Sequence, residues 1–257
     1  MCHDALYLDY SVVISSTGRK DYLIELLWSI TFQSYPPAEV IILLDDNSIG
    51  YDCVSAISHL EFKLPLRLEL CNKLNLPAKR NLGTKLATTE ILMYSDDDDL
   101  WAPVKAERIL SIIHKGYSCV CHNFSCFGSE KMSSCNVLGL QSRPLSKYHL
   151  LYGDNIYGGG STITSSKSVV LAIPFNENLA SCEDLDWWRR VQLSGNIIYY
   201  CGEDLVSYRR HESNMGKNKK LMSYTQLKVA LDGLLFGIAL SIGSCVMIFK
   251  GIIRSVR

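Results

Sequence analysis

Residues 10–48 read YSVVISSTGRKDYLIELLWSITFQSYPPAEVIILLDDNS and predict a strand, a helix and a second strand in succession. The apolar runs at 10–15 and 39–44 lack a regular polar face, which is typical of strands that are buried on both sides. Between them, residues 22–32 carry Leu and Ile at helical spacing. Two parallel strands joined by a helix form a right-handed crossover, the repeating unit of a parallel sheet.

The same alternation continues along the chain. Apolar runs at 66–70 and 90–95 predict two further strands, and residues 78–86 predict a helix between them. The order β-α-β-α-β-α-β indicates an α/β fold class, a doubly wound sheet with helices on both faces. The second half is less regular, with a helix at 104–113, a strand at 117–127, a glycine-rich loop at 153–162, a helix at 182–195 and a strand at 196–201.

Composition limits the function classes. The 257 residues contain 26 Lys and Arg and 26 Asp and Glu, so no overall basic field exists to hold nucleic acid. There are ten cysteines, but residues 1–9 lack the apolar core of a signal peptide, which favours reduced thiols and a cytoplasmic location. The cluster Cys119, Cys121, His122 and Cys126 matches no common zinc spacing and is expected to be buried instead.

Near the C-terminus, residues 233–249 (GLLFGIALSIGSCVMIF) carry no charge. This is at the short limit for a membrane span, which needs about 20 apolar residues. We expect a catalytic domain at 1–220, with halves 1–103 and 104–220, and a hydrophobic membrane-associating helix within 221–257 at the cytoplasmic face. A span, an interfacial helix, a helix docked on a partner and a buried core helix all remain open.

Polar residues follow each predicted strand of the first half. Because ligands bind at the carboxyl ends of the strands in open α/β sheets, these residues are expected to meet at one edge. They are Ser15 to Gly18, Asp45 to Ser48, Lys79 to Asn81, and Asp96 to Asp99.

The run of four aspartates is the strongest local signal. Neighbouring carboxylates in a concave site repel one another unless a cation compensates them. Mg²⁺ or Mn²⁺, held by one or two carboxylates and by substrate phosphate oxygens, is the expected cofactor. Asp45 or Asp46 could accept hydrogen bonds from a base or ribose, and Arg80 could donate to a base or phosphate. A solvated acidic loop is the alternative.

The chain resembles the glycosyltransferases of family 2, which have the GT-A fold, from Tyr10 to about Gly216. Five motifs stand in the family's order: SVVISSTGRKDYLIELLWSITFQSYPPAEVIILLDDNS, LPAKRNLGTKLATTEILMYS, SDDDDLW, IPFNENLASCEDLDWWRRVQLSG and LVSYRRHESN. The first loop departs from the family pattern, because Ser15, Thr17 and Gly18 replace its usual proline, aromatic residue and asparagine.

The resemblance implies the following site residues. The nucleotide would be bound by Ser15, Asp46, Arg80 and Asp96, and the metal of the D-x-D motif by Asp98 and Asp99, with His211 of the closing motif as a further candidate. Contacts with the acceptor or the transferred sugar would come from Gly159, Gly160, Glu183 and Trp187. For Trp187 the alternative is burial in the core.

Asp184 would be the catalytic base. It would remove the proton of the acceptor hydroxyl as that oxygen attacks the anomeric carbon with inversion. Its position at the start of a helix, which favours a negative charge, agrees with that role, although a capping aspartate would occupy the same place.

We expect the protein to be an inverting, divalent-metal-dependent glycosyltransferase that acts in the biosynthesis of a surface polysaccharide or glycoconjugate. The donor is a nucleoside-diphosphate sugar, with UDP favoured, and the acceptor a glycan or a lipid-linked glycan. A nucleotidyltransferase is one alternative, but SSTGRK is a poor match to its glycine-rich basic loop. An inactive sugar-nucleotide-binding or membrane scaffold protein is another, and it would be expected to lack Asp184 or the acidic run.

Overall fold

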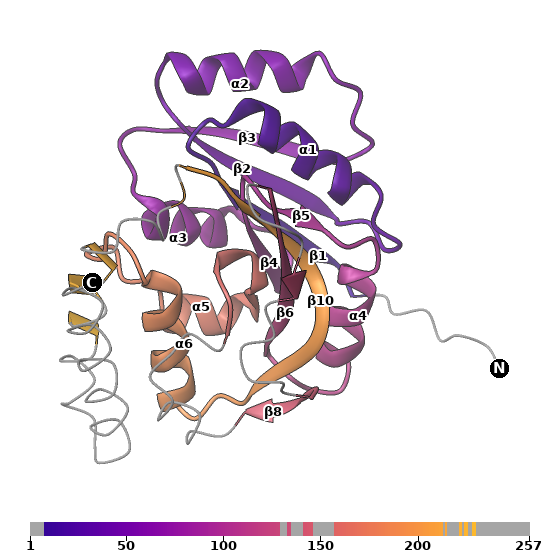
Figure 1. The fold of residues 1–257 in the computed structure, drawn as a ribbon, viewed down its shortest axis with the longest axis vertical. Coiled ribbons are helices and arrows are strands. Elements are labelled where there is room, and N and C mark those ends of the chain that lie inside the picture. Colours follow the sequence, from indigo (N-terminus) through magenta and orange to yellow (C-terminus); the bar gives the residue numbers. More distant parts are fainter. Residues whose placement is uncertain are drawn as a thin grey trace.

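The structure is a computed structural model that describes residues 8–128, 133–134, 141–145, 157–212, 214, 221–222, 224–225 and 228–229 (Figure 1). Strands and helices alternate through the first half, as the sequence predicts. The elements there are β1 (Tyr10–Ser15), α1 (Lys20–Thr31), β2 (Glu39–Asp45), α2 (Ser48–Ser58), β3 (Leu66–Cys71), α3 (Leu76–Leu86), β4 (Ile91–Asp96) and β5 (Leu100–Trp101).

The second half adds shorter and more varied elements. They are α4 (Lys105–Ile113), β6 (Cys119–Gly128), β7 (Ser133–Ser134), β8 (Arg143–Leu145), the 3-10 helix η2 (Gly160–Thr162), β9 (Thr164–Ser166), α5 (Lys167–Ala172), α6 (Glu183–Leu193) and β10 (Ile198–Arg210).

All these strands belong to one sheet. The order along it is β3-β2-β1-β4-β9-β6-β10-β5, with β7 paired to β6 and β8 paired to β10. The four main strands of the first half, β1 to β4, pair in parallel, which confirms the predicted parallel sheet. The short strand β9 runs antiparallel between β4 and β6 and joins the two halves.

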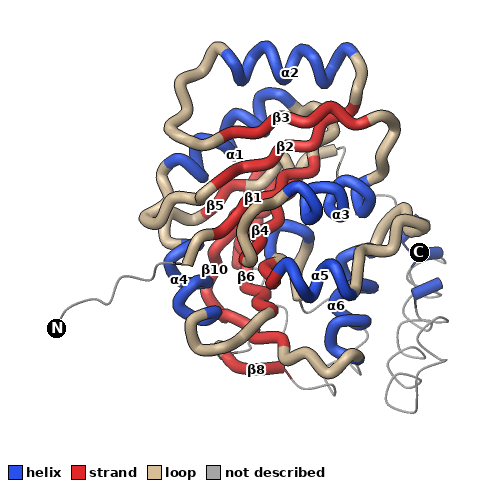
Figure 2. Tube along the Cα trace, turned by 180° about the vertical axis from the view of Figure 1, so that it is seen from behind, coloured by secondary structure: helices blue, strands red, loops and turns tan. Residues whose placement is uncertain are grey.

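Helices cover both faces of the sheet, because successive side chains of the central strands point to opposite sides. Val12 of β1 packs in a core under α1, α2 and α4, whereas its neighbour Val13 packs in a second core under α3, α5 and α6. Figure 2 shows α3, α5 and α6 together on one side. This arrangement is the doubly wound α/β architecture that the sequence predicts.

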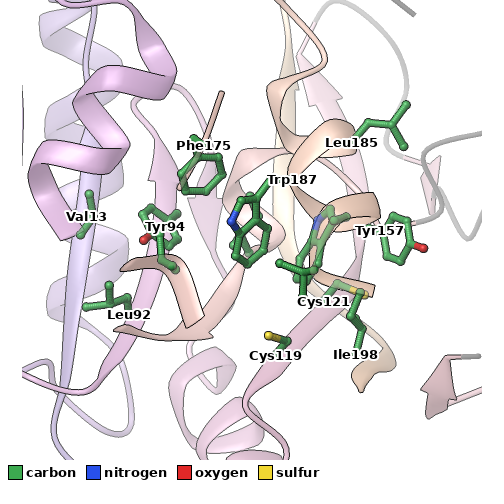
Figure 3. Close-up of a cluster of buried hydrophobic side chains, with 14 of the residues drawn as sticks. Val13, Leu92, Tyr94, Cys119, Cys121, Tyr157, Phe175, Leu185, Trp187 and Ile198 are labelled. Carbon is green, nitrogen blue, oxygen red and sulfur yellow. The ribbon is translucent and has the colours of Figure 1, made fainter. Parts of the chain in front are cut away.

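The second core extends across both halves of the chain (Figure 3). Trp187 lies at its centre, fully buried, with its ring 5.1 Å from that of Phe175 and its indole N–H donating to the carbonyl oxygen of Ile173 at 2.7 Å. The expectation that this ring contacts a sugar is therefore wrong. Both Trp187 and Trp188 face inward, so α6 is anchored by two buried indoles.

The proposed halves 1–103 and 104–220 share this sheet as well as this core. Trp101 and Leu100 of β5 pair with Val206 and Ser207 of β10, so a strand of the first half lies beside a strand of the second. In the described part of the chain, no helix is long and apolar enough to cross a membrane. The predicted hydrophobic helix at 233–249 lies outside the described residues.

Candidate active site

Two adjoining cavities open where β1, β2 and β4 end, at the edge that the sequence predicts. The first, about 430 Å³, is lined by Ser15, Thr17, Arg19, Leu76, Asp96, Asp98, Gly159, Gly160, Cys182, Glu183, Asp184, Tyr208, Asn214 and Met222. The second, about 380 Å³, shares Ser15, Thr17 and Leu76 with it and extends over Asp45 and Lys79. We call them the acidic cavity and the side cavity.

The four consecutive aspartates at the end of β4, Asp96 to Asp99, have separate environments. Asp96 accepts a hydrogen bond from Nη2 of Arg80 at 2.8 Å. Asp97 is fully buried and accepts from the hydroxyl of Ser16 at 2.6 Å, from the backbone N–H of Thr17 at 2.9 Å and from Arg19. It ties the loop after β1 to the loop after β4 and does not line either cavity.

Asp98 is the aspartate that faces His211. Its Oδ2 atom lies 2.9 Å from Nε2 of His211, which follows the last residue of β10, and 2.6 Å from Nη1 of Arg19. The structure therefore brings together two of the predicted metal ligands, from loops more than a hundred residues apart in the sequence.

Asp99 does not reach the cavities, contrary to its assignment as a metal ligand. It is 1% exposed and accepts hydrogen bonds from the hydroxyl of Ser161 at 2.6 Å and from the backbone N–H of Arg209 at 3.0 Å. Burial and the nearby charge of Asp98 raise the pKa of this carboxyl well above its usual value. Asp99 thus links η2 to β10 as a structural group.

Arg80 is buried as well, and the structure does not support a contact with a base. Its Nη1 donates to Oε1 of Glu183 at 2.6 Å, while Nη2 holds Asp96. Gly160 passes so close that a Cβ atom there would stand 2.0 Å from Nη2 of Arg80. A single guanidinium therefore connects α3, β4 and α6 and fixes two carboxylates that line the acidic cavity.

Asp184 lies in the first turn of α6 and lines the same cavity as Asp96 and Asp98. Burial and the neighbouring charge of Glu183 raise the pKa of Asp184 to about 7, and the positive charge of Arg80 opposes that shift. The preceding residue, Cys182, has a φ of 56°, in the left-handed region that side chains other than glycine rarely adopt. Such local strain is common next to functional groups.

The two consecutive aspartates at the end of β2, Asp45 and Asp46, lie in different surroundings. Asp45 lines the side cavity, where its Oδ1 lies 2.6 Å from Nζ of Lys79, and the same ammonium donates to the carbonyl oxygen of Ser16. Asp46 is exposed and lines neither cavity. Asp45, and not the predicted Asp46, is therefore the aspartate of this pair that lines a cavity.

The remaining predicted residues reach the cavities. Ser15 lines both cavities, and Gly159, Gly160 and Glu183 line the acidic one. Arg19, which the sequence analysis missed, lies in the loop after β1, and its place at the carboxyl edge of the sheet is the signal that could have indicated it.

The pair of Asp98 and His211 fits a divalent cation. Two neighbouring ligands of an octahedral ion stand about 3.0 Å apart when each bond is about 2.1 Å, and the two facing atoms here are 2.9 Å apart. Within the described residues, no group of three or more His, Cys, Asp or Glu side chains is placed to hold an ion. Further ligands would have to come from water or a diphosphate, as is usual for Mg²⁺.

Comparison with known proteins gives the family of the chain. Residues 11–149, more than half of the chain, match the family model described as glycosyl transferase family 2. The chain is 31% identical over 211 residues to the amylovoran biosynthesis glycosyltransferase AmsB of Erwinia amylovora, covering 78% of this chain and 69% of that protein. It is 25% identical over 218 residues to the putative teichuronic acid biosynthesis glycosyltransferase TuaG of Bacillus subtilis, covering 81% and 82%.

Solved structures share the fold. The complex of S. aureus TarS 1-349 with UDP-GlcNAc superimposes with a TM-score of 0.74 at 16% identity, covering 96% of this chain and 72% of that one. The mannosyltransferase PcManGT from Pyrobaculum calidifontis, in complex with GDP-Man and Mn²⁺, gives 0.66 at 13% identity, covering 98% and 75%. Taken with the family match and the likeness to AmsB, these results establish that the chain belongs to glycosyl transferase family 2 and is a glycosyltransferase with the GT-A fold.

Proposed function

We propose that this glycosyltransferase is an inverting, divalent-cation-dependent enzyme that moves a sugar from a nucleoside-diphosphate donor to a hydroxyl group of a glycan acceptor. The observation that carries the proposal is the position of Asp184, with its pKa raised to about 7, in the same cavity as Asp96 and Asp98. A carboxylate with such a pKa is well suited to remove a proton near neutral pH.

The two cavities would bind different parts of the donor. The base and ribose would lie in the side cavity, where Asp45 offers a carboxylate oxygen and Ser15 and Thr17 lie between it and the acidic cavity. The diphosphate would lie near Asp98 and His211, and a bound Mn²⁺ or Mg²⁺ would stabilise the negative charge of the leaving diphosphate.

Asp184 would take the proton from the acceptor hydroxyl while that oxygen forms the new bond to the anomeric carbon and the bond to the diphosphate breaks. Arg80 donates hydrogen bonds to both Glu183 and Asp96, which holds these two carboxylates in place in the same cavity. A single displacement of this kind inverts the anomeric centre.

UDP is the favoured nucleotide, because TarS, which shares the fold, is known in complex with UDP-GlcNAc. The names of AmsB and TuaG support a role in surface polysaccharide biosynthesis. We further propose that the domain works at the cytoplasmic face of the membrane, held there by the segment 221–257, on the strength of its uncharged sequence at 233–249.

Calorimetric titration of the purified protein with UDP, GDP and dTDP, in Mn²⁺ or in EDTA, tests the donor site. We expect one nucleotide to bind tightly in Mn²⁺ and weakly in EDTA. Asp98→Ala should bind that nucleotide weakly in both conditions. Asp45→Asn is expected to weaken nucleotide binding about tenfold, as for a lost hydrogen bond to a charged group, and Asp46→Asn, its exposed neighbour, serves as the matched control. If none of the three nucleotides binds, the proposed donor site is wrong.

A further inference from the structure

Arg19 contacts both of the atoms proposed to hold the cation. The residue caps the start of α1 and its side chain is 28% exposed at the wall of the acidic cavity. Its Nη1 atom lies 2.6 Å from Oδ2 of Asp98 and 3.2 Å from Nε2 of His211. One positively charged group thus bridges the carboxylate and the imidazole.

The other side of the guanidinium is held separately. Nε donates to Oδ1 of Asp97 at 2.9 Å, and Nη2 contacts the same oxygen. Asp97 is itself fixed, because it is fully buried and also accepts from Ser16 and Thr17. The guanidinium therefore has an anchored edge on Asp97 and a second edge, at Nη1, that faces the cavity.

A divalent cation would compete with Nη1 for Oδ2 of Asp98 and for the space beside Nε2 of His211. An ion bound to both Oδ2 of Asp98 and Nε2 of His211 would lie about 2.1 Å from each, and Nη1 lies 2.6 and 3.2 Å from the same two atoms. The cation and the guanidinium of Arg19, both bound to the same carboxylate, would repel each other strongly in a partly buried site. Arginine cannot relieve this repulsion by losing its proton, since it stays charged in proteins.

We propose that Arg19 and a divalent cation are alternative occupants of the Asp98–His211 pair, and that the diphosphate of the donor drives the exchange between them. The inference rests on the proposed donor site. When cation and diphosphate arrive together, the planar guanidinium of Arg19 turns as one unit, so that Nη1 leaves Asp98 and His211 and donates to a phosphate oxygen. Planar guanidinium forks suit phosphate in this way.

This exchange would make cation binding depend on the nucleotide. Without diphosphate, the cation would have to displace a well-placed positive charge and would gain only two protein ligands. With diphosphate, the displaced guanidinium gains a new partner and the ion gains phosphate oxygens. Arg19 would thus keep the acidic cavity neutralised between turnovers and admit the cation with its substrate.

Binding of Mn²⁺, followed by loss of the free-ion signal in electron paramagnetic resonance, tests the proposal without measuring activity. For the wild type we expect weak binding of Mn²⁺ alone and tighter binding when UDP is present. Arg19→Ala should bind Mn²⁺ alone about tenfold more tightly or better, because a competing charge is gone. Arg19→Lys should stay close to the wild type, because it retains a charge that reaches the same carboxylate.

Two further variants make the result specific. Arg108→Ala removes an arginine whose side chain is 53% exposed and pairs with Glu203, so it should leave Mn²⁺ binding unchanged. Adding Asp98→Ala to Arg19→Ala should abolish the gain. If Arg19→Ala binds Mn²⁺ alone no more tightly than the wild type, the competition does not exist. Failure of the donor site would show differently, as wild-type protein that binds no nucleotide in Mn²⁺.

Discussion

At the scale of single residues, the acidic cavity depends on how each carboxylate is neutralised. Arg80 contacts Asp96 and Glu183, Arg19 contacts Asp97 and Asp98, and burial together with the charge of Glu183 raises the pKa of Asp184. A carboxyl that is partly protonated at neutral pH is active as a base only when the pH is high enough to ionise it.

We therefore expect kcat/KM to fall as the pH drops below about 7, the pKa of Asp184. Burial is the larger cause of this raised pKa and the charge of Glu183 the second; Glu183→Gln removes that charge but keeps an oxygen for Arg80, so the falling limb should move to lower pH. Asp184→Asn should lower kcat by about 100-fold or more. The measurement is a pH–rate profile of each variant, with the exposed Glu61→Gln as control. If the falling limb lies at the same pH in Glu183→Gln as in the wild type, a group other than Asp184 determines it.

The sequence predicts most of the site residues but not their individual roles. Asp98 and His211 come together because each follows a strand that ends at the same edge, and Asp184, in the first turn of α6, lines the same cavity as Asp98. Asp45 and Asp46 could not be told apart, because consecutive residues at a strand end point to opposite sides and a shift of one residue exchanges them. Asp99 was misassigned for the same reason, in a run of identical residues.

At the scale of elements, the predicted strands of the first half agree with the structure because their apolar runs are continuous. β9 (Thr164–Ser166) was not predicted, since it carries no apolar side chain and owes its place to pairing with β4 and β6. β10 was expected to end at residue 201, but it continues to Arg210. Its register with β6 shifts after Cys201, and such irregularities interrupt the alternation that sequence analysis relies on.

The turn at η2 brings the backbone of Gly160 close to the side chain of Arg80. Gly160→Ala places a Cβ atom 2.0 Å from Nη2 of Arg80 and 2.8 Å from Oδ1 of Asp96, and Arg80 is too deeply buried to move aside. We expect a loss of about 1–3 kcal/mol in the free energy of unfolding, as for other overpacked sites.

Gly159→Ala is the matched control, because a Cβ atom there meets nothing within 4 Å. Its free energy of unfolding should stay within about 0.5 kcal/mol of the wild type. Urea denaturation of the two variants makes the comparison, and equal stabilities would contradict the close approach of Gly160 to Arg80.

At the scale of the whole molecule, the two halves form one structural unit. Val13 and Tyr94 of the first half share a core with Trp187 and Ile198 of the second (Figure 3), and β5 of the first half pairs with β10. We infer that the halves unfold together, because neither keeps a complete core without the other. The sequence showed the change in regularity near residue 103 but not the long-range pairing that crosses it.

Trp187→Phe tests this shared core and the role of the ring. The variant leaves a gap beside Phe175, so the free energy of unfolding should fall by about 1–3 kcal/mol in a single urea transition. KM for the acceptor should not change, because Trp187 is fully buried and lines neither cavity. A raised KM for the acceptor with unchanged stability would instead mean that Trp187 contacts the acceptor.

The common wall of the two cavities also matters for inhibitor design. Ser15, Thr17 and Leu76 border both the side cavity and the acidic cavity, so the two form adjoining compartments. Small fragments found separately for each could be joined by a short linker across this wall. The second fragment would then bind as if at high local concentration, and the joined compound would gain affinity without any new contact.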